Sequence, residues 1–265
     1  MPELPEVEAN LRNFAAWCVG RRITGARPAA LARRLAGREV KAVERRGKWM
    51  LARLGGGAGL GLHLGMTGKI ARAEGDVLPR FTRAVFEMSD GGRVCFVDLR
   101  RFGRIRAEPS YEALLRRPEI AAIGPDALHA LDLRHLREAF ASTSRTVKET
   151  IMDQRVLGGL GNIYAAEALW RARIHPATAA RAIDAPALRA LARGIRWALR
   201  RGLREFPKGE VPAYVEEGAP NPFFVYARAG EPCRRCRARL QGMVLGGRST
   251  VFCPRCQLSR RSQPG

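Results

Sequence analysis

The amino-acid sequence predicts an α+β protein in which a strand-rich N-terminal part is followed by helices and then by a small cysteine module. Between about residues 38 and 107, short β-like runs alternate with glycine-rich or charged turns. Beyond about residue 125, apolar residues recur at helical spacing. Two Cys-x2-Cys pairs stand near the C-terminus. These changes predict three parts, over residues 1–125, 126–225 and 226–265.

The first predicted element is an amphipathic helix over residues 5–18, because Val7, Leu11, Phe14 and Cys18 recur at helical spacing. Glu3 and Glu6 then lie at or just before its first turn. The helix dipole stabilises negative charge there, so both carboxylates have a plausible structural role.

Pro2 is a candidate nucleophile. Removal of Met1 would leave Pro2 with a free secondary amine, which can attack a sugar aldehyde carbon and form a permanently charged iminium ion. A proline after the initiator methionine also occurs in chains without such chemistry. The dipeptide therefore needs support from the rest of the sequence.

The strand-rich region contains six short runs separated by turns such as Gly55-Gly56-Gly57 and Asp90-Gly91-Gly92. This pattern predicts an antiparallel sandwich or barrel. Lys48 lies at the turn between the first two runs. The runs are Glu39–Arg45, Trp49–Leu54, Gly61–Leu64, Ala84–Met88, Arg93–Val97 and Arg104–Ala107.

The middle part contains four predicted helices, over Leu133–Ala141, Val147–Asp153, Asn162–Ala172 and Ala185–Arg204. Asn162 follows a glycine-rich turn, where asparagine is a good N-cap. A helix N-terminus behind such a turn is also a potential phosphate site. The two roles are compatible.

The cysteine module predicts a metal site. Cys233, Cys236, Cys253 and Cys256 form two Cys-x2-Cys pairs separated by 16 residues, a spacing typical of one structural zinc ion. A pair of disulfides and an iron site are the alternatives. Between the pairs, Arg237–Val244 and Thr250–Phe252 can form a hairpin that turns at Gly246-Gly247. Arg248 at its tip suits either a phosphate contact or a solvated turn.

The overall charge favours a polyanionic partner. The chain has 47 Lys and Arg residues against 25 Asp and Glu, a formal net charge of +22 and a pI near 11.3. Nucleic acid is the usual partner of such a chain. Five of the 47 basic residues are lysine, so part of the arginine excess reflects a GC-rich coding bias. We find neither a signal peptide nor an apolar run of about 18 residues, so we expect a cytoplasmic, nucleoid-associated protein of bacterial type.

Taken together, these motifs resemble the formamidopyrimidine-DNA glycosylase (Fpg/MutM) family, which is related to endonuclease VIII. The resemblance covers nearly the whole chain and implies a β-sandwich, a helix–two-turn–helix domain with a zinc finger, and DNA in the cleft between. It rests on the motifs Pro2–Glu8, Arg46–Lys48, His63–Gly68, Asp98–Gly103, Met152–Gln154, Gly161–Ala165 and Arg248–Gln257.

The resemblance also implies roles in catalysis. Pro2 attacks C1′ of the deoxyribose, and Glu3 acts as general acid–base. Lys48 lies near the phosphate and the damaged base, while Glu6 supports the amine or the helix terminus. The expected activity is that of a bifunctional DNA glycosylase and abasic-site lyase that removes oxidised purines and nicks the strand by β,δ-elimination. One structural zinc ion is expected, with no redox or nucleotide cofactor.

Damaged-base repair requires the nucleotide to leave the helical stack. The resemblance assigns Met66, Arg100 and Phe102 to the resulting gap, although Met66 and Phe102 would otherwise suit a core. The glycines beside them favour exposed loop tips. His63, Asn162 and Arg248 are the expected DNA-backbone contacts, and Lys148 is expected either to contact a phosphate or to support such a contact indirectly. The expected partner is double-stranded DNA with damaged bases, bound by a monomer.

The sequence departs from the family pattern in a few places. Ala227 and Arg237 stand where we expect glycine, Leu240 replaces a β-branched residue, and Leu99 stands where proline is frequent. The segment Pro207–Phe224 is short and proline-rich in the region that closes over 8-oxoguanine in the family. It leaves open an endonuclease VIII-like preference for oxidised pyrimidines. A catalytically silent DNA-binding paralogue is the third alternative.

Overall fold

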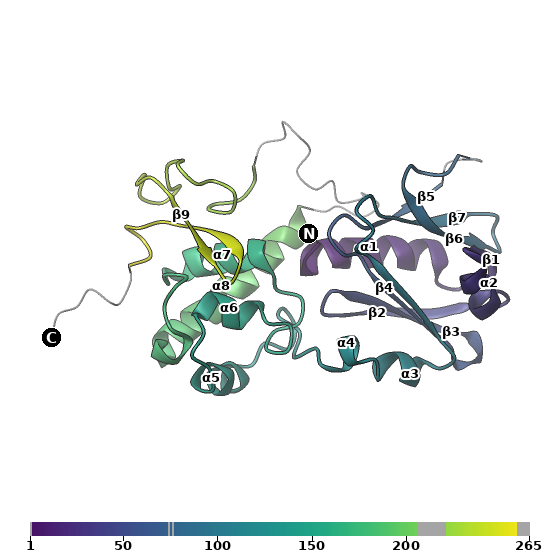
Figure 1. The fold of residues 1–265 in the computed structure, drawn as a ribbon, viewed down its shortest axis with the longest axis horizontal. Coiled ribbons are helices and arrows are strands. Elements are labelled where there is room, and N and C mark those ends of the chain that lie inside the picture. The colour runs from purple at the N-terminus through teal and green to yellow at the C-terminus, as the bar shows by residue number, and fades with distance from the viewer. Residues whose placement is uncertain (1, 74, 76, 206–220, 259–265) are drawn as a thin grey trace. The chain divides into compact units, whose positions relative to one another are not determined.

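The computed structural model describes residues 2–73, 75, 77–205 and 221–258. The chain divides into two compact units, of which the first extends from the N-terminus to Ala122 and the second begins at Ile123. The first unit holds helix α1 and the strands β1 to β8. The second holds the helices α5 to α8 and the C-terminal hairpin (Figure 1).

The first unit contains two four-stranded antiparallel sheets. One has the order β1 (Ile23–Arg27), β6 (Thr82–Met88), β7 (Arg93–Val97), β5 (Lys69–Arg72). The other has the order β2 (Val40–Arg46), β3 (Trp49–Leu54), β4 (Gly59–His63), β8 (Arg104–Glu108). Within the described residues the two sheets remain separate, so the architecture is the sandwich and not the barrel.

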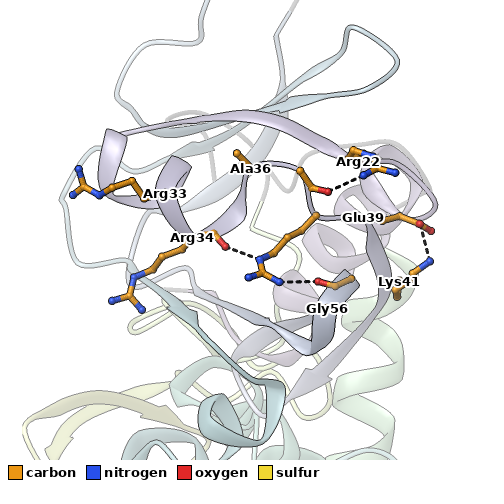
Figure 2. Close-up of a pocket in the computed structure, with 10 residues that line it drawn as sticks. Arg22, Arg33, Arg34, Ala36, Glu39, Lys41 and Gly56 are labelled. Atoms are coloured by element: carbon orange, nitrogen blue, oxygen red, sulfur yellow. Dashed lines mark hydrogen bonds and ion pairs between the residues drawn. The ribbon is translucent and has the colours of Figure 1, made fainter.

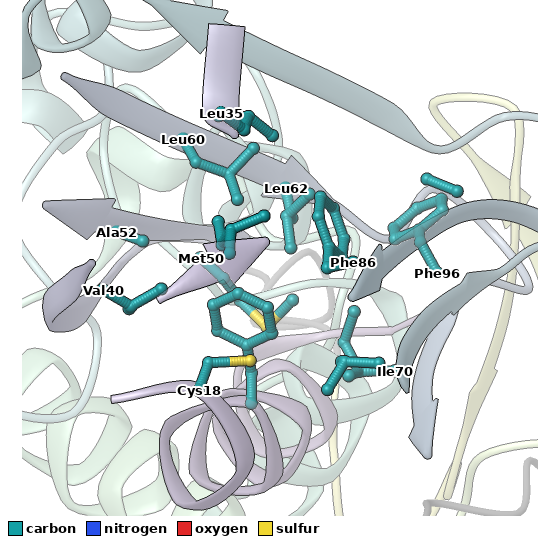
Figure 3. Close-up of a cluster of buried hydrophobic side chains, with 14 of the residues drawn as sticks. Cys18, Leu35, Val40, Met50, Ala52, Leu60, Leu62, Ile70, Phe86 and Phe96 are labelled. Carbon is teal, nitrogen blue, oxygen red and sulfur yellow. The ribbon is translucent and has the colours of Figure 1, made fainter. Parts of the chain in front are cut away.

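Helix α1 (Leu4–Cys18) supplies one side of the core between the sheets. The four residues whose spacing predicted this helix are all buried in that core (Figure 3). Burial raises the pKa of the Cys18 thiol to about 12, so Cys18 stays neutral and packs as an apolar side chain. Phe14 meets Phe86 of β6 edge to face, with ring centroids 6.3 Å apart. Each buried side chain of this size contributes about 1.5–3 kcal/mol of hydrophobic stabilisation.

Several short elements of the first unit carry no strong periodicity in the sequence and were not predicted. They are β1, β5, the helix α2 (Ala29–Leu35), the 3-10 turn η1 (Gly55–Gly57), and the helices α3 (Tyr111–Leu115) and α4 (Pro118–Ala121).

The second unit is helical and ends in a hairpin. Its elements are α5 (Leu133–Ala141), α6 (Val147–Met152), α7 (Asn162–Ala172), the 3-10 turn η2 (Ala180–Ala182), α8 (Ala185–Arg204), β9 (Gln241–Leu245) and β10 (Arg248–Phe252). Asp132 caps α5 through its carboxylate, and Thr146 with Glu149 forms a capping box on α6. Gly246 and Gly247 have φ of 54° and 69°, as a two-residue hairpin turn requires. The α+β fold class is confirmed.

A buried carboxylate holds the segment before the cysteine module. Glu167 of α7 is 3% exposed and accepts hydrogen bonds from the backbone N–H groups of Phe224, Val225 and Tyr226. Burial raises the pKa of Glu167. Ala227 and Arg237, at the two positions where we expected glycine, have φ of 58° and 66°. The backbone therefore keeps the left-handed conformation that glycine favours, and the two residues tolerate it.

Candidate active site and nucleic-acid interface

The N-terminus of α1 carries a pair of interlocked carboxylates. Glu3 is the N-cap residue and Glu6 is the third helical residue, and they form a reciprocal capping box. The Glu3 N–H donates to Glu6 Oε2 at 2.8 Å, and the Glu6 N–H donates to the Glu3 carboxylate. Glu3 is 1% exposed and Glu6 is 4% exposed. Pro2, also buried, directly precedes this pair. The chain terminus therefore has two fixed carboxylates beside it.

Asn10 attaches this helix end to the first sheet. Its Nδ2 group donates to the Glu6 carbonyl at 2.9 Å, and its Oδ1 accepts from the Ile70 N–H at 2.7 Å. Asn10 is fully buried. Asn10 was not assigned a role from the sequence.

Lys48 lies in the turn between β2 and β3, as predicted, and is 8% exposed. The turn is tied to α1 through Arg45, whose side chain is 5% exposed. Arg45 Nε donates to Glu8 Oε2 at 3.0 Å, while a terminal N–H of Arg45 donates to the Gly47 carbonyl at 3.1 Å. This ion pair connects the Lys48 turn to α1, the helix that follows Pro2 and Glu3. Neither Glu8 nor Arg45 was assigned a role from the sequence.

His63, the last residue of β4, lies at the same end of the second sheet as Lys48. In the register, His63 pairs with Trp49 on one side and with Arg104 on the other. Burial, then the positive charges of Lys48 and Arg104, lower the pKa of His63 to about 4. Its Nδ1 accepts a hydrogen bond from the Gly65 N–H at 3.1 Å. A neutral imidazole with Nδ1 as acceptor carries its proton on Nε2, and this N–H can donate to an anion.

Met66, Arg100 and Phe102 lie on two loops that contact each other. A Cβ on Gly65 would lie 2.5 Å from the backbone N of Gly103, so the two backbones meet there. Arg100 and Phe102 are exposed, and the Arg100 guanidinium lies 5.1 Å from the centre of the Phe102 ring. Phe102 is 53% exposed, and Met66 is half-buried. Phe102 is therefore a loop-tip residue and not a core residue.

Asp98 braces these two loops, which we call the wedge loops (residues 65–68 and 98–103). It is 1% exposed. Its Oδ1 accepts from the Thr67 hydroxyl at 2.6 Å, and its Oδ2 accepts from the Gly103 N–H at 2.7 Å. The Thr67 Oγ1 in turn accepts from the Arg100 N–H at 3.1 Å. One buried carboxylate thus connects the loop of Met66 to the loop of Arg100 and Phe102.

In the second unit, Lys148 is buried and lies beneath the expected phosphate contacts. It is 1% exposed, so this structure does not support the direct DNA contact considered for it. Its Nζ donates to Asn162 Oδ1 at 2.6 Å, to Thr250 Oγ1 at 2.5 Å and to the Ser249 carbonyl at 3.4 Å. Lys148 therefore joins the start of α7 to strand β10 of the hairpin.

Asn162 is the first residue of α7, and its N-cap is Gly161, so the N-cap role considered for Asn162 is wrong. The Asn162 side chain instead donates from Nδ2 to the Ser249 carbonyl at 3.0 Å. Arg248, beside Ser249 at the start of β10, is exposed. The helix terminus and the hairpin tip are therefore held together, with an exposed guanidinium next to them.

The four predicted metal ligands converge. The Sγ atoms of Cys233, Cys236, Cys253 and Cys256 lie within 4.8 Å of one another. Backbone N–H groups of Arg235 and Cys256, and the indole N–H of Trp170, donate to two of these sulfurs. Such donors stabilise the thiolate form that binds zinc. Four thiolates close a tetrahedral shell, so the residues fit one structural zinc ion.

These features define a class of protein: a two-unit DNA-binding protein with a potential amine nucleophile at its N-terminus and a zinc-supported hairpin. Among the described residues, none of the helices combines the length and hydropathy that crossing a membrane requires.

Comparison with known proteins identifies the family. Three family descriptions match in order: the formamidopyrimidine-DNA glycosylase N-terminal domain over residues 1–105, the H2TH domain of the same enzymes over 123–209, and a zinc finger found in FPG and IleRS over 230–258. The formamidopyrimidine-DNA glycosylase of Chloroflexus aurantiacus is 36% identical over 98% of both chains. The chain belongs to the formamidopyrimidine-DNA glycosylase family.

Solved structures agree. A MutM in complex with DNA containing carbocyclic 8-oxo-G superposes with a TM-score of 0.86 at 29% identity, covering 97% of this chain and all of that one. The MutM (Fpg) protein of Thermus thermophilus gives 0.83 at 32% identity, over 97% of this chain and 99% of that chain. The recognition of the family, the zinc ion and the assignment as an enzyme are confirmed. The segment Pro207–Phe224, whose composition left the preferred lesion open in the sequence, lies outside the described residues up to position 220.

Proposed function

We propose that this protein removes oxidised purines from double-stranded DNA and then cleaves the strand, with the amine of Pro2 as the nucleophile. The observation that carries the proposal is the buried carboxylate pair beside Pro2. Glu6 holds the backbone of Glu3, so Glu3 is fixed next to the chain terminus, where a general acid–base is needed.

The chemistry follows from these groups once Met1 is removed. The Pro2 nitrogen forms a bond to C1′ as the bond from C1′ to the damaged base breaks, and the proton that the nitrogen loses is transferred to the departing base. Glu3 donates a proton to the ring oxygen O4′, the C1′–O4′ bond opens, and the iminium ion forms. Loss of a C2′ proton then expels the 3′ phosphate, and loss of a C4′ proton expels the 5′ phosphate. Water hydrolyses the iminium ion, which releases the sugar fragment as an aldehyde and returns the Pro2 amine.

Lys48 supplies a positive charge and His63 a hydrogen-bond donor for the phosphates around the lesion, at one end of the second sheet of the first unit. Asn162 and Arg248 supply donors in the second unit. Lys148 acts as a positioning residue through its contacts to Asn162 and Thr250. The net charge of +22 favours such backbone binding without sequence preference.

The wedge loops fill the gap that the extruded nucleotide leaves. Phe102 and Met66 enter the stack, and Arg100 binds the orphaned partner base, a use of apolar wedges known in proteins that kink DNA. The substrate class is supported by the family and by the MutM structure with 8-oxo-G DNA. The protein then works as a monomer at the nucleoid, where its substrate lies.

A panel of lesion duplexes tests the proposal. Single-turnover excision is measured on duplexes with 8-oxoguanine or formamidopyrimidine opposite cytosine, and with thymine glycol opposite adenine. We expect the two purine lesions to be excised at least tenfold faster than thymine glycol. Equal or faster excision of thymine glycol would replace the substrate assignment with oxidised pyrimidines. No excision of any lesion would leave a DNA-binding protein without this activity.

A further inference from the structure

A basic pocket of 460 Å³ lies in the first unit, away from the residues assigned to catalysis. It is formed by Arg22 before β1, by α2 and the segment that leads from α2 into β2, and by the glycine turn after β3 (Figure 2). The Gly20 N–H donates to the Val40 carbonyl at 2.9 Å, which places the pocket at the C-terminal end of α1. A 15-residue helix is about 22 Å long, so the pocket lies roughly that far from Pro2.

The charge of this pocket is not balanced. Five cationic side chains line it, from Arg22, Arg33, Arg34, Arg38 and Lys41. Glu39 is the one carboxylate in the lining, and it is paired with Lys41 at 2.7 Å. Within the described residues, none of the four guanidinium groups is paired with a carboxylate. Four positive charges therefore gather around one cavity, a repulsion that a bound anion would relieve.

Three arginines of this pocket, Arg22, Arg34 and Arg38, donate to carbonyl groups, which fix their geometry without neutralising their charge. Arg38 Nε donates to the Arg34 carbonyl and a terminal N–H of Arg38 donates to the Gly55 carbonyl, both at 2.9 Å. Arg22 donates to the Gly37 carbonyl at 3.0 Å. A guanidinium has five N–H groups, so each of these arginines keeps donors for a ligand.

The glycine turn is part of this arrangement. Gly56 has φ of 73°, and a Cβ there would lie 2.8 Å from a terminal nitrogen of Arg38. A side chain at position 56 would therefore push Arg38 away from the Gly55 carbonyl. Both hydrogen bonds therefore depend on the position of the Arg38 side chain.

We propose that this pocket is a binding site for an anion that carries two or more phosphate groups. Fixed guanidinium groups bind phosphate through charge-assisted, often bidentate hydrogen bonds, and little conformational freedom is lost because the carbonyl contacts already orient them. The cavity exceeds the volume of one phosphate and has cations on several walls. The ligand is either a free oligophosphate or the backbone of a DNA strand outside the catalytic complex. The site is independent of the proposed glycosylase activity.

Calorimetry with tripolyphosphate tests the site on the full-length, zinc-loaded protein. The test variant is the double substitution Arg33→Glu and Arg34→Glu, whose side chains are exposed on α2. The control is Arg189→Glu with Arg193→Glu, two exposed arginines on α8 with the same change of net charge. We expect tripolyphosphate to bind at least tenfold more weakly to the test variant than to the control, and excision from a short lesion duplex to be equal in both.

A competition experiment then distinguishes a free oligophosphate from the DNA backbone as the ligand of the pocket. If single-stranded oligodeoxythymidylate displaces tripolyphosphate from the wild-type protein and from the control variant, the DNA backbone is a ligand of the pocket. If it does not, the ligand is a free oligophosphate. Equal binding of tripolyphosphate to both variants, with matching thermal unfolding curves, would show that the affinity is a property of the whole basic surface and would overturn the proposal.

Discussion

The brace formed by Asp98 leads to a quantitative prediction for the substitution Asp98→Asn. The carboxylate accepts two hydrogen bonds, from Thr67 and Gly103, and is 1% exposed. Asparagine has one oxygen, so its amide nitrogen would face one of these two donors. The substitution therefore loses one charge-assisted hydrogen bond and leaves a buried donor unpaired, at a cost of about 3 kcal/mol. That cost corresponds to roughly a hundredfold change in an equilibrium constant.

This cost should appear mainly in the step that opens the base stack, because the brace connects the wedge loops. We expect single-turnover excision of 8-oxoguanine from a paired duplex to fall about a hundredfold, from the cost above. Excision from a bubble, in which the lesion is already unpaired, should fall far less. Thermal unfolding is measured alongside. Asp90→Asn is the control, since Asp90 is an exposed carboxylate of the same unit.

Two outcomes would refute this reasoning. If the duplex and the bubble lose activity equally, the brace does not act through the wedge loops. If Asp98→Asn changes neither excision nor unfolding more than Asp90→Asn does, the two hydrogen bonds contribute little. Thr67→Val offers a second probe, because it keeps the shape of the side chain and removes the hydroxyl that links Asp98 to Arg100.

Three further predictions concern pH, zinc and salt. His63 has a pKa of about 4 in the folded protein against 6.5 in the unfolded chain, so the unfolded chain binds the proton first. The free energy of unfolding should therefore fall by up to about 3 kcal/mol as the pH drops from about 6.5 towards 4. His63→Gln should flatten this part of the pH dependence measured by urea unfolding, and an unchanged pH dependence would contradict the assignment. Zinc removal by a chelator should unfold the hairpin and weaken DNA binding at least tenfold. The fluorescence of Trp170, whose indole N–H donates to Cys233 Sγ, should change as the zinc is lost. Unchanged DNA binding by the zinc-free protein would contradict the role of the hairpin. Arg248→Ala should lower the magnitude of the slope of log affinity against log salt concentration by about 0.9, as the loss of one phosphate contact requires. Arg189→Ala should leave this slope unchanged. Equal slopes for the two variants would exclude a phosphate contact by Arg248.

The sequence predicted the elements with strong local periodicity. The bounds expected for Leu133–Ala141, Asn162–Ala172 and Ala185–Arg204 are those observed. The first and last of these helices bury one apolar face, whereas α7 is buried on all sides from Tyr164 to Trp170. The short strands β1 and β5 were missed, since they have little alternation of their own. Their partners, β6 and β7, lie far along the chain or across a loop. Such pairings depend on the packing of the whole sheet and leave little trace in a single run of residues.

The candidate site likewise contains residues that motifs identify and residues that only the fold brings together. The four cysteines could be selected from the spacing of the metal ligands alone, whereas Pro2 and Lys48 were selected because the motifs that contain them resemble those of a known family. The residues that hold the site together could not. Asp98 stands within a motif that was recognised, yet nothing in the sequence showed that its partners would be Thr67 and Gly103. The burial of Lys148 beneath Asn162 likewise depends on a strand that lies about a hundred residues later.

The central claim is that Pro2 is the nucleophile, and borohydride trapping with peptide mapping tests it most directly. Protein from which Met1 has been removed is incubated with an 8-oxoguanine duplex and borohydride, and the covalent product is digested and analysed by mass spectrometry. The account predicts one adduct, on the nitrogen of Pro2, and none in protein that retains Met1. An adduct on Lys48 or another lysine, or no adduct during active excision, would contradict it.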